Sequence, residues 1–182
     1  MVMRLLFVFL STLASLFVHA ARPNFTYLEA GYLNQESDEL CDQDGLFLGG
    51  RYEVNSQAFF TAGFANVDGD GSCGSESLSI GYGLRGDYGN SSTFYGLGRV
   101  IRRDYEVDDD FGVGGEFGFR SIFIEGLELN ALVGFEKIDD FEQIFAGVGF
   151  DYWVAQGFSV AGNFVINDEN DTSISIAARL HF

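Results

Sequence analysis

The feature that most constrains this chain is an alternation of apolar and polar residues at a period of two, which restarts after each cluster of turn residues. Successive side chains of a β-strand point to opposite faces, so this pattern predicts strands with one apolar and one polar face. Each alternating segment has roughly the 9–11 residues that a tilted strand needs to cross a bilayer. Ten segments can be marked: Phe25–Asn34, Gly45–Asn55, Ala58–Asn66, Leu78–Tyr88, Thr93–Arg103, Phe111–Arg120, Leu127–Lys137, Gln143–Trp153, Phe158–Asn167 and Thr172–Phe182.

The last of these segments shows the two faces most clearly. Apolar residues occupy the even positions from Ile174 to Phe182, while Ser, Ala, Arg and His occupy the odd positions from Ser173 to His181. The first face suits lipid and the second suits a polar lumen. In the fifth segment both faces carry apolar residues, and we orient Arg99 inward because an arginine that faces lipid near the midplane costs about 2–4 kcal/mol.

The connections between the segments distinguish a membrane barrel from a soluble β-sandwich, which also alternates. Bacterial barrels have short periplasmic turns and longer outer loops. The sequence therefore predicts an all-β fold, a transmembrane antiparallel up-and-down β-barrel of ten strands with both chain ends in the periplasm. An error in dividing the segments would make the count eight or twelve. The odd-numbered connections are acidic (Gln35–Asp44, Val67–Ser77, Asp104–Asp110, Ile138–Glu142 and Asp168–Asp171), and the even-numbered ones are mostly tighter (Ser56-Gln57, Gly89–Ser92, Ser121–Gly126 and Val154–Gly157).

Composition excludes a disordered chain despite a formal net charge of −17 at pH 7. With 47% hydrophobic and 16% aromatic residues, the chain is too apolar for disorder. Its 24 Gly, 20 Phe and 8 Tyr beside a single Pro and a single Trp favour strands and tight turns. The acidic residues therefore belong to a folded body, and their excess gives no reason to expect a nucleic-acid partner.

The first twenty residues have the features of a secretory signal peptide. Arg4 provides a short positive region, an apolar stretch follows from Leu5 to Val18, and Val18-His19-Ala20 forms a small-residue cleavage site. The apolar stretch is shorter than the roughly 20 residues that a transmembrane helix needs. We predict cleavage after Ala20 or Ala21, which divides the chain into a signal peptide, 1–20, and one barrel domain, 21–182, that resides in the cell outer membrane.

Three stretches carry a family resemblance: Tyr27–Asn34, Asp44–Arg51 and the terminal Ala178–Phe182. They resemble a family of small Gram-negative outer-membrane barrels described as regulated by a diffusible signal factor, and more loosely the OmpA-like and OmpX-like barrels. The likeness spans most of the mature chain and rests on the residue pattern of the strands and on the positions of the turn residues. It implies an outer-membrane barrel without established catalytic residues. It also makes Phe182 similar to the terminal signal that the barrel assembly machinery recognises.

Side chains for catalysis are scarce. The mature chain has one histidine, His181, at the predicted periplasmic end, and about 30 Å of hydrocarbon separates it from the Ser and Asp residues of the outer loops. Asp68-Gly69-Asp70-Gly71-Ser72 is similar to the start of a calcium loop, but Cys73 and Ser79 stand where an EF-hand needs Gly and Glu. We therefore predict no enzyme activity, no cofactor and no ordered metal site, and we rank an outer-membrane enzyme third, behind the two functions considered next.

Charged residues predicted to face the lumen leave two functions open. An eight-stranded barrel is just filled by its own side chains, and ten strands lie close to that size. We therefore predict a largely side-chain-filled lumen and a structural or surface-interaction role. The alternative is a narrow, cation-preferring channel for small solutes or ions. The predicted lumen charges are Glu29, Arg51, Glu53, Arg85, Asp87, Arg99, Glu116, Arg120, Glu128, Glu136, Asp151 and Arg179, five arginines against seven acids.

The two cysteines lie in the first and second outer loops, which adjoin each other on the predicted rim. Thiols readily form disulfides in the oxidising periplasm. A separation of 32 residues fits no familiar zinc spacing, so we predict a Cys41–Cys73 disulfide. The partners that we expect are outer-membrane lipid, lipopolysaccharide and the barrel assembly machinery, with divalent cations attracted to the acidic outer loops.

Overall fold

The computed structural model describes residues 22–37, 41–69, 73–105, 109–139 and 141–182. The predicted signal peptide, with its cleavage site at Ala20, lies outside these residues. No helix in the described part of the chain is long and apolar enough to cross a membrane. The described residues form ten β-strands: β1 (Tyr27–Glu36), β2 (Gln43–Asn55), β3 (Ala58–Gly69), β4 (Ser75–Tyr88), β5 (Ser92–Tyr105), β6 (Asp109–Ile124), β7 (Leu127–Ile138), β8 (Phe141–Ala155), β9 (Phe158–Asn167) and β10 (Thr172–His181).

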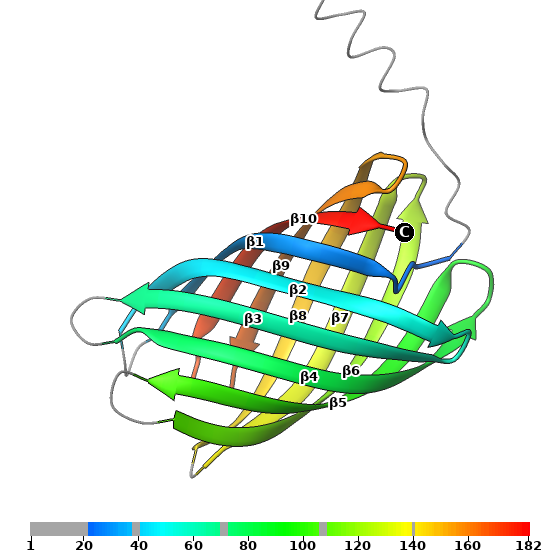
Figure 1. The fold of residues 1–182 in the computed structure, drawn as a ribbon. Coiled ribbons are helices and arrows are strands. Elements are labelled where there is room, and N and C mark those ends of the chain that lie inside the picture. Colours follow the sequence, from blue (N-terminus) through cyan, green and yellow to red (C-terminus); the bar gives the residue numbers. More distant parts are fainter. Residues whose placement is uncertain (1–21, 38–40, 70–72, 106–108, 140) are drawn as a thin grey trace, which may run out of the picture.

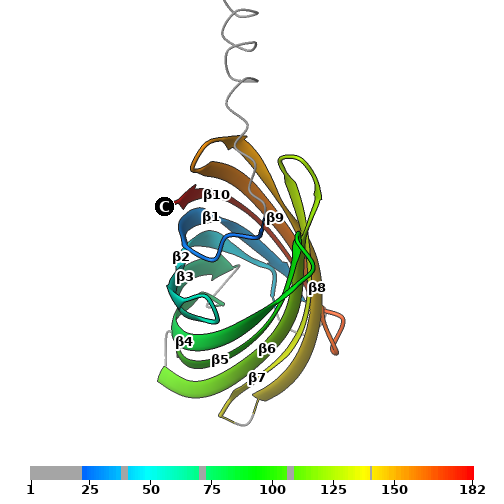
Figure 2. The same cartoon turned by 90° about the vertical axis from the view of Figure 1, so that its right-hand side faces the viewer.

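The strands close into a single barrel (Figures 1 and 2). Each strand pairs antiparallel with its neighbours in the sequence, and β10 returns to pair with β1 along a seam that places Tyr27 opposite His181 and Glu29 opposite Arg179. Closure leaves no strand edge with unpaired backbone groups, which a bilayer would not tolerate. The structure therefore confirms the predicted ten-stranded antiparallel up-and-down barrel.

Short turns join the strands at the end of the barrel that holds the first and last strand residues (Figure 1). The connections from β6 to β7 and from β8 to β9 are two residues long, and their glycines, Gly126 and Gly157, have φ values of 79° and 76°. Residues other than glycine rarely adopt this backbone conformation. Both hairpins have a β-bulge just before the turn, between Ile122 and Ile124 in one and between Trp153 and Ala155 in the other. We call this end the periplasmic end, as the sequence analysis predicts.

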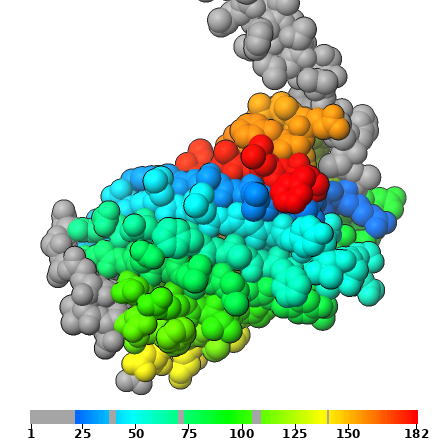
Figure 3. All heavy atoms as spheres, viewed as in Figure 1, coloured from blue at the N-terminus to red at the C-terminus, as the bar shows by residue number. Residues whose placement is uncertain are grey.

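The outside of the wall is apolar. Leu48, Ile80 and Val133 are 58%, 62% and 54% exposed although they lie in the middle of long strands. Figure 3 shows part of this wall, over β1 to β4. Near the periplasmic end the outer face also carries aromatic rings, with Phe94 packed between Tyr88 and Phe119. An apolar band with aromatic residues at its border matches the lipid-facing surface of membrane barrels.

Several predicted strand bounds were wrong, each for a physical reason. The strand predicted from Phe25 begins at Tyr27, because Phe25 turns into the barrel instead of joining the wall. The strand predicted to end at Arg120 continues to Ile124, since the bulge shifts the alternation there. At the outer end several strands, including β4, begin earlier than predicted, because polar residues still find backbone partners on both neighbouring strands.

Candidate functional site: the lumen of the barrel

All twelve charged residues predicted for the lumen lie in ion pairs, and eleven of the twelve pair within the set. The exception is Asp87, which pairs with Arg22 at 2.6 Å. The pairs within the set are Arg179–Glu29 (2.7 Å), Arg51–Glu116 (3.4 Å), Arg85–Glu53 (2.7 Å), Arg99–Glu136 (3.1 Å), Arg179–Asp151 (2.8 Å) and Arg120–Glu128.

The sequence analysis missed Arg103, a further arginine of this network. Its Nη2 lies 2.8 Å from Glu136 Oε1, so one carboxylate binds both Arg99 and Arg103. The signal was present in the sequence, because Arg103 is four residues after Arg99 and therefore shares its face of β5. With Arg103, six arginines instead of five oppose the seven acids, and the lumen network is close to neutral.

Ion pairs of β6, β7, β8 and β10 are the most deeply buried. Asp151 is fully buried and accepts a hydrogen bond from Arg179 Nη1. Glu128 is 1% exposed and pairs with Arg120. Burial of a charge costs free energy unless the charge is paired and hydrogen-bonded. These ion pairs therefore fix the positions of the strands that carry them relative to one another. They fill the periplasmic half of the lumen on that side.

The sequence analysis considered only the Ser and Asp residues of the outer loops, which are far from His181. The structure places a serine and an aspartate of the wall next to it. Ser159 Oγ lies 2.7 Å from His181 Nε2, and Asp151 Oδ2 lies 4.0 Å from the same nitrogen. All three belong to strands, and their proximity depends on cross-strand register. Trp153 stacks on the His181 ring at 4.0 Å between centroids.

This Ser–His pair lacks two features of a nucleophilic site. In a catalytic triad the carboxylate binds the ring nitrogen that does not face the serine, whereas Asp151 approaches the nitrogen that Ser159 contacts. Ser159 is also fully buried, and neither of the two lumen cavities described below is lined by Ser159 or His181. A substrate therefore has no route to the hydroxyl in this arrangement.

The residues before β1 enter the lumen at the periplasmic end. Phe25 is fully buried, and its ring lies 5.0 Å from that of Phe59 and 5.6 Å from that of Tyr95. The guanidinium groups of Arg120, Arg85 and Arg51 lie 4.6, 5.1 and 5.8 Å from the centre of the Phe25 ring. Cations attract the negative face of an aromatic ring, so the arginines of the wall hold Phe25 in place.

Beyond Phe25 the lumen is hollow. A cavity of about 360 Å³ lies in the middle of the barrel, and Arg51, Tyr95 and Arg120 are among its lining residues. A second cavity of about 450 Å³ lies toward the outer end, lined by groups such as Glu36 and Asp171. Arg99 and Glu116 line both cavities. The lumen is therefore filled at the periplasmic end and hollow in the middle and toward the outside.

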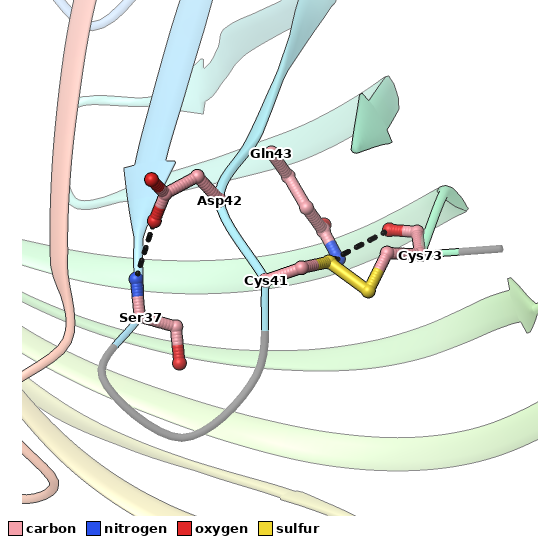
Figure 4. Close-up of a disulfide and its surroundings, with 5 residues drawn as sticks. All are labelled: Ser37, Cys41, Asp42, Gln43 and Cys73. Atoms are coloured by element: carbon pink, nitrogen blue, oxygen red, sulfur yellow. Dashed lines mark hydrogen bonds between the residues drawn. A yellow bond between two sulfur atoms is a disulfide. The ribbon is translucent and has the colours of Figure 1, made fainter. Parts of the chain in front are cut away.

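The outer rim carries the predicted disulfide (Figure 4). Cys41 and Cys73 are bonded, with their Cα atoms 6.4 Å apart. Gly69 lies directly beneath the bridge, and a Cβ atom there would come within 3.1 Å of Cys41 Sγ. Next to the bridge, Asp42 accepts a hydrogen bond from the backbone N–H of Ser37 at 3.3 Å. The disulfide thus ties the loop before β2 to the loop after β3.

A metal site does not emerge at this rim. Among the described residues no group of three or more His, Cys, Asp or Glu side chains is arranged to hold a metal ion. Three residues of the calcium-loop-like stretch, Asp70, Gly71 and Ser72, lie outside the described residues.

Comparisons with known proteins identify the architecture. No protein-family model matches the chain, and no curated protein matches it in sequence. Among solved structures, the β-domain of the Bordetella autotransporter BrkA is similar with a TM-score of 0.54 and 16% identity, over 86% of this chain and 99% of that one. The translocator domain of the autotransporter NalP from Neisseria meningitidis has a TM-score of 0.51 and 12% identity, over 98% and 95%. The fold is thus that of outer-membrane β-barrels.

Proposed function

We propose that this chain is an integral outer-membrane barrel that is closed at its periplasmic end and acts at the cell surface. The observation that carries the proposal is the filled periplasmic end, where Phe25 and the buried ion pairs around Asp151 occupy the lumen. A solute that enters from outside meets this layer after the two cavities. The closed barrel therefore supports a structural or surface-interaction role and disfavours free conduction.

The outer end supplies the surface for such a role. Its described acids include Glu36, Asp44, Asp68, Asp110 and Asp171, and the disulfide fixes two of the loops that carry them. Acidic groups concentrated in one place raise the local concentration of cations. Lipopolysaccharide is itself anionic and is bridged by divalent cations, so a cation-mediated contact between this rim and lipopolysaccharide is the partner relationship that we propose.

Two further parts of the proposal concern processing and catalysis. Signal cleavage after Ala20 leads to a mature barrel domain that starts at residue 21, and Phe182 is the signal for the assembly machinery. The inaccessible Ser159 hydroxyl and the position of Asp151 support a barrel without enzymatic activity. The Ser159–His181 hydrogen bond then satisfies buried polar groups in the wall.

Two experiments test the closed barrel and its orientation, the first on the unaltered chain and the second on epitope-tagged chains. Liposomes that contain the protein purified from outer membranes should exclude small sugars and amino acids as well as protein-free liposomes do. An epitope inserted after Glu169, in the β9–β10 connection, should be accessible on intact cells, whereas one after Asn90, in the β4–β5 turn, should not. Rapid solute entry would contradict the closed lumen, and labelling at Asn90 alone would reverse the orientation.

A further inference from the structure

We propose that residues 22–26 form a removable plug, and that without it the barrel is a narrow, cation-preferring conduit. This inference goes beyond the proposed closed function, because it states which part of the chain closes the lumen and what the lumen does when that part leaves. It concerns Arg22, Pro23, Asn24, Phe25 and Thr26, which precede β1 and belong to no strand.

The plug is held differently from the wall. Every strand of the wall is hydrogen-bonded along its length to a strand on each side, and its removal would open the barrel. The plug is instead held mainly by side chains of the wall. Arg85 Nη1 donates to the backbone oxygen of Pro23 at 3.4 Å, and Arg120 Nη1 donates to that of Asn24 at 3.0 Å. These contacts can break without disturbing the backbone ladder.

Contacts at the two ends of the segment include a single backbone hydrogen bond to the wall, which extends the β1–β10 seam. Arg22 pairs with Asp87 at the periplasmic mouth, where the arginine side chain is 55% exposed, so water competes for this contact. At the other end Thr26 Oγ1 accepts a hydrogen bond from the backbone N–H of Glu53 at 3.2 Å, and the Thr26 carbonyl accepts one from Phe182 at 3.4 Å. The segment can therefore pivot about Tyr27, the first residue of β1.

Phe25 is separated from the central cavity by a single layer of side chains. Its ring lies against Arg51, Tyr95 and Arg120, and these same three residues line the central cavity. When the ring leaves, its space adds to that cavity from the periplasmic side. The central cavity in turn shares Arg99, Glu116 and other lining residues with the outer cavity. The buried ion pairs around Asp151 remain, but they lie on the side of β6, β7, β8 and β10, so loss of the plug would open a narrow path beside them from the periplasmic mouth to the outer end.

Charge predicts what the conduit would prefer. The central cavity is lined by four arginines and two glutamates. Glu136, Glu128 and Asp151 pair with three of these arginines and bring the lumen close to balance, whereas the formal net charge of the chain is −17. Most of the remaining acids among the described residues lie toward the outer end, where they attract cations to the entrance. Rings of acidic side chains favour cations in channels. Small cations and small polar solutes are therefore the expected cargo.

Planar-bilayer recordings of four variants, each made in the full chain and purified from outer membranes, test the plug. A deletion of residues 22–26 and the substitution Phe25→Ala should give discrete, cation-selective conductance steps. Phe25→Leu keeps an apolar side chain in the lumen and should stay closed. Phe60→Ala removes a neighbouring aromatic ring from the outer face instead, and should also stay closed. Circular dichroism and heat-dependent gel mobility verify the fold of each variant.

The outcomes separate this inference from the proposed closed function. A closed unaltered chain with a conducting deletion variant supports both. If the unaltered chain and the folded deletion variant are both closed, the plug is refuted while the closed barrel stands. Equal conductance in both refutes the closed function and the plug together. Since the deletion removes no strand residue, it keeps the test decisive even if Phe25→Ala does not fold.

Discussion

Arg179 on the last strand and Glu29 on the first strand form an ion pair across the seam that closes the barrel, with Arg179 Nε 2.7 Å from Glu29 Oε2. The same arginine donates through Nη1 to the fully buried Asp151 of β8. One side chain therefore joins β1, β10 and β8 inside the lumen. The joint is built from residues about 150 positions apart in the chain and can form only when the barrel has closed.

The seam arginine should accordingly be important for stability. Arg179→Met removes the partner of two carboxylates, and uncompensated buried charge costs about 3–5 kcal/mol. Arg102→Gln is the matched control, because Arg102 is 47% exposed and exposed ion pairs contribute about 0–1 kcal/mol. Urea unfolding in detergent or lipid measures both variants. Equal midpoints for the two would show that the seam ion pair does not stabilise the closed barrel.

The lipid-facing wall predicts a different response at two neighbouring positions of β7. Val133 faces outward in the apolar band, and Val133→Arg should destabilise the folded barrel by about 2–4 kcal/mol. Leu132 lines both lumen cavities, so Leu132→Arg should cost less. Reversible folding into vesicles gives both free energies. A larger cost at Leu132 would mean that the two faces of the wall are interchanged.

The disulfide should act locally. The chain-entropy model limits its contribution to about 3–4 kcal/mol, and the barrel already brings the two loops together, so Cys73→Ser should lower global stability by less. Limited proteolysis should then cut the loops around Cys41 sooner than in the unaltered protein. Mass spectrometry after alkylation without reduction checks the bond itself. Two alkylated cysteines, or cross-linked dimers, in protein from the outer membrane would contradict the internal bridge.

The terminal residue should matter for assembly more than for stability. Phe182 follows β10 and is 68% exposed on the outer side, so its deletion removes little packing. If the assembly machinery recognises it, the deletion should lower the amount of folded barrel in the outer membrane while leaving signal cleavage unchanged. Fractionation with a gel-mobility assay measures this. Normal membrane levels would exclude Phe182 as a required signal.

Alternation and turn residues were enough to predict the strand number and the closure of the barrel. Arg99 lines the central cavity, on the same face of β5 as the buried Tyr95 and Leu97. These features depend on local period and on the cost of charge in lipid, and a single sequence carries both.

Other features depend on contacts that a single sequence does not encode. Phe25 has the spacing of a wall residue, and its contacts with arginines and aromatic rings of other strands hold it in the lumen. The Ser159–His181 contact depends on how β9 and β10 are aligned, and the bulge at Trp153 and Ala155 sets the alignment of β8 beside them. A shift of one residue would send either side chain to the opposite face.

The central claim, a membrane barrel closed at its periplasmic end, is tested most directly by planar-bilayer conductance of the unaltered chain. The filled layer around Phe25 and Asp151 predicts a quiet membrane, with no discrete steps at either voltage polarity. Insertion of the unaltered chain is verified by the heat-dependent gel mobility of protein recovered from vesicles of the same lipid. Reproducible, cation-selective steps from the unaltered chain would contradict the account.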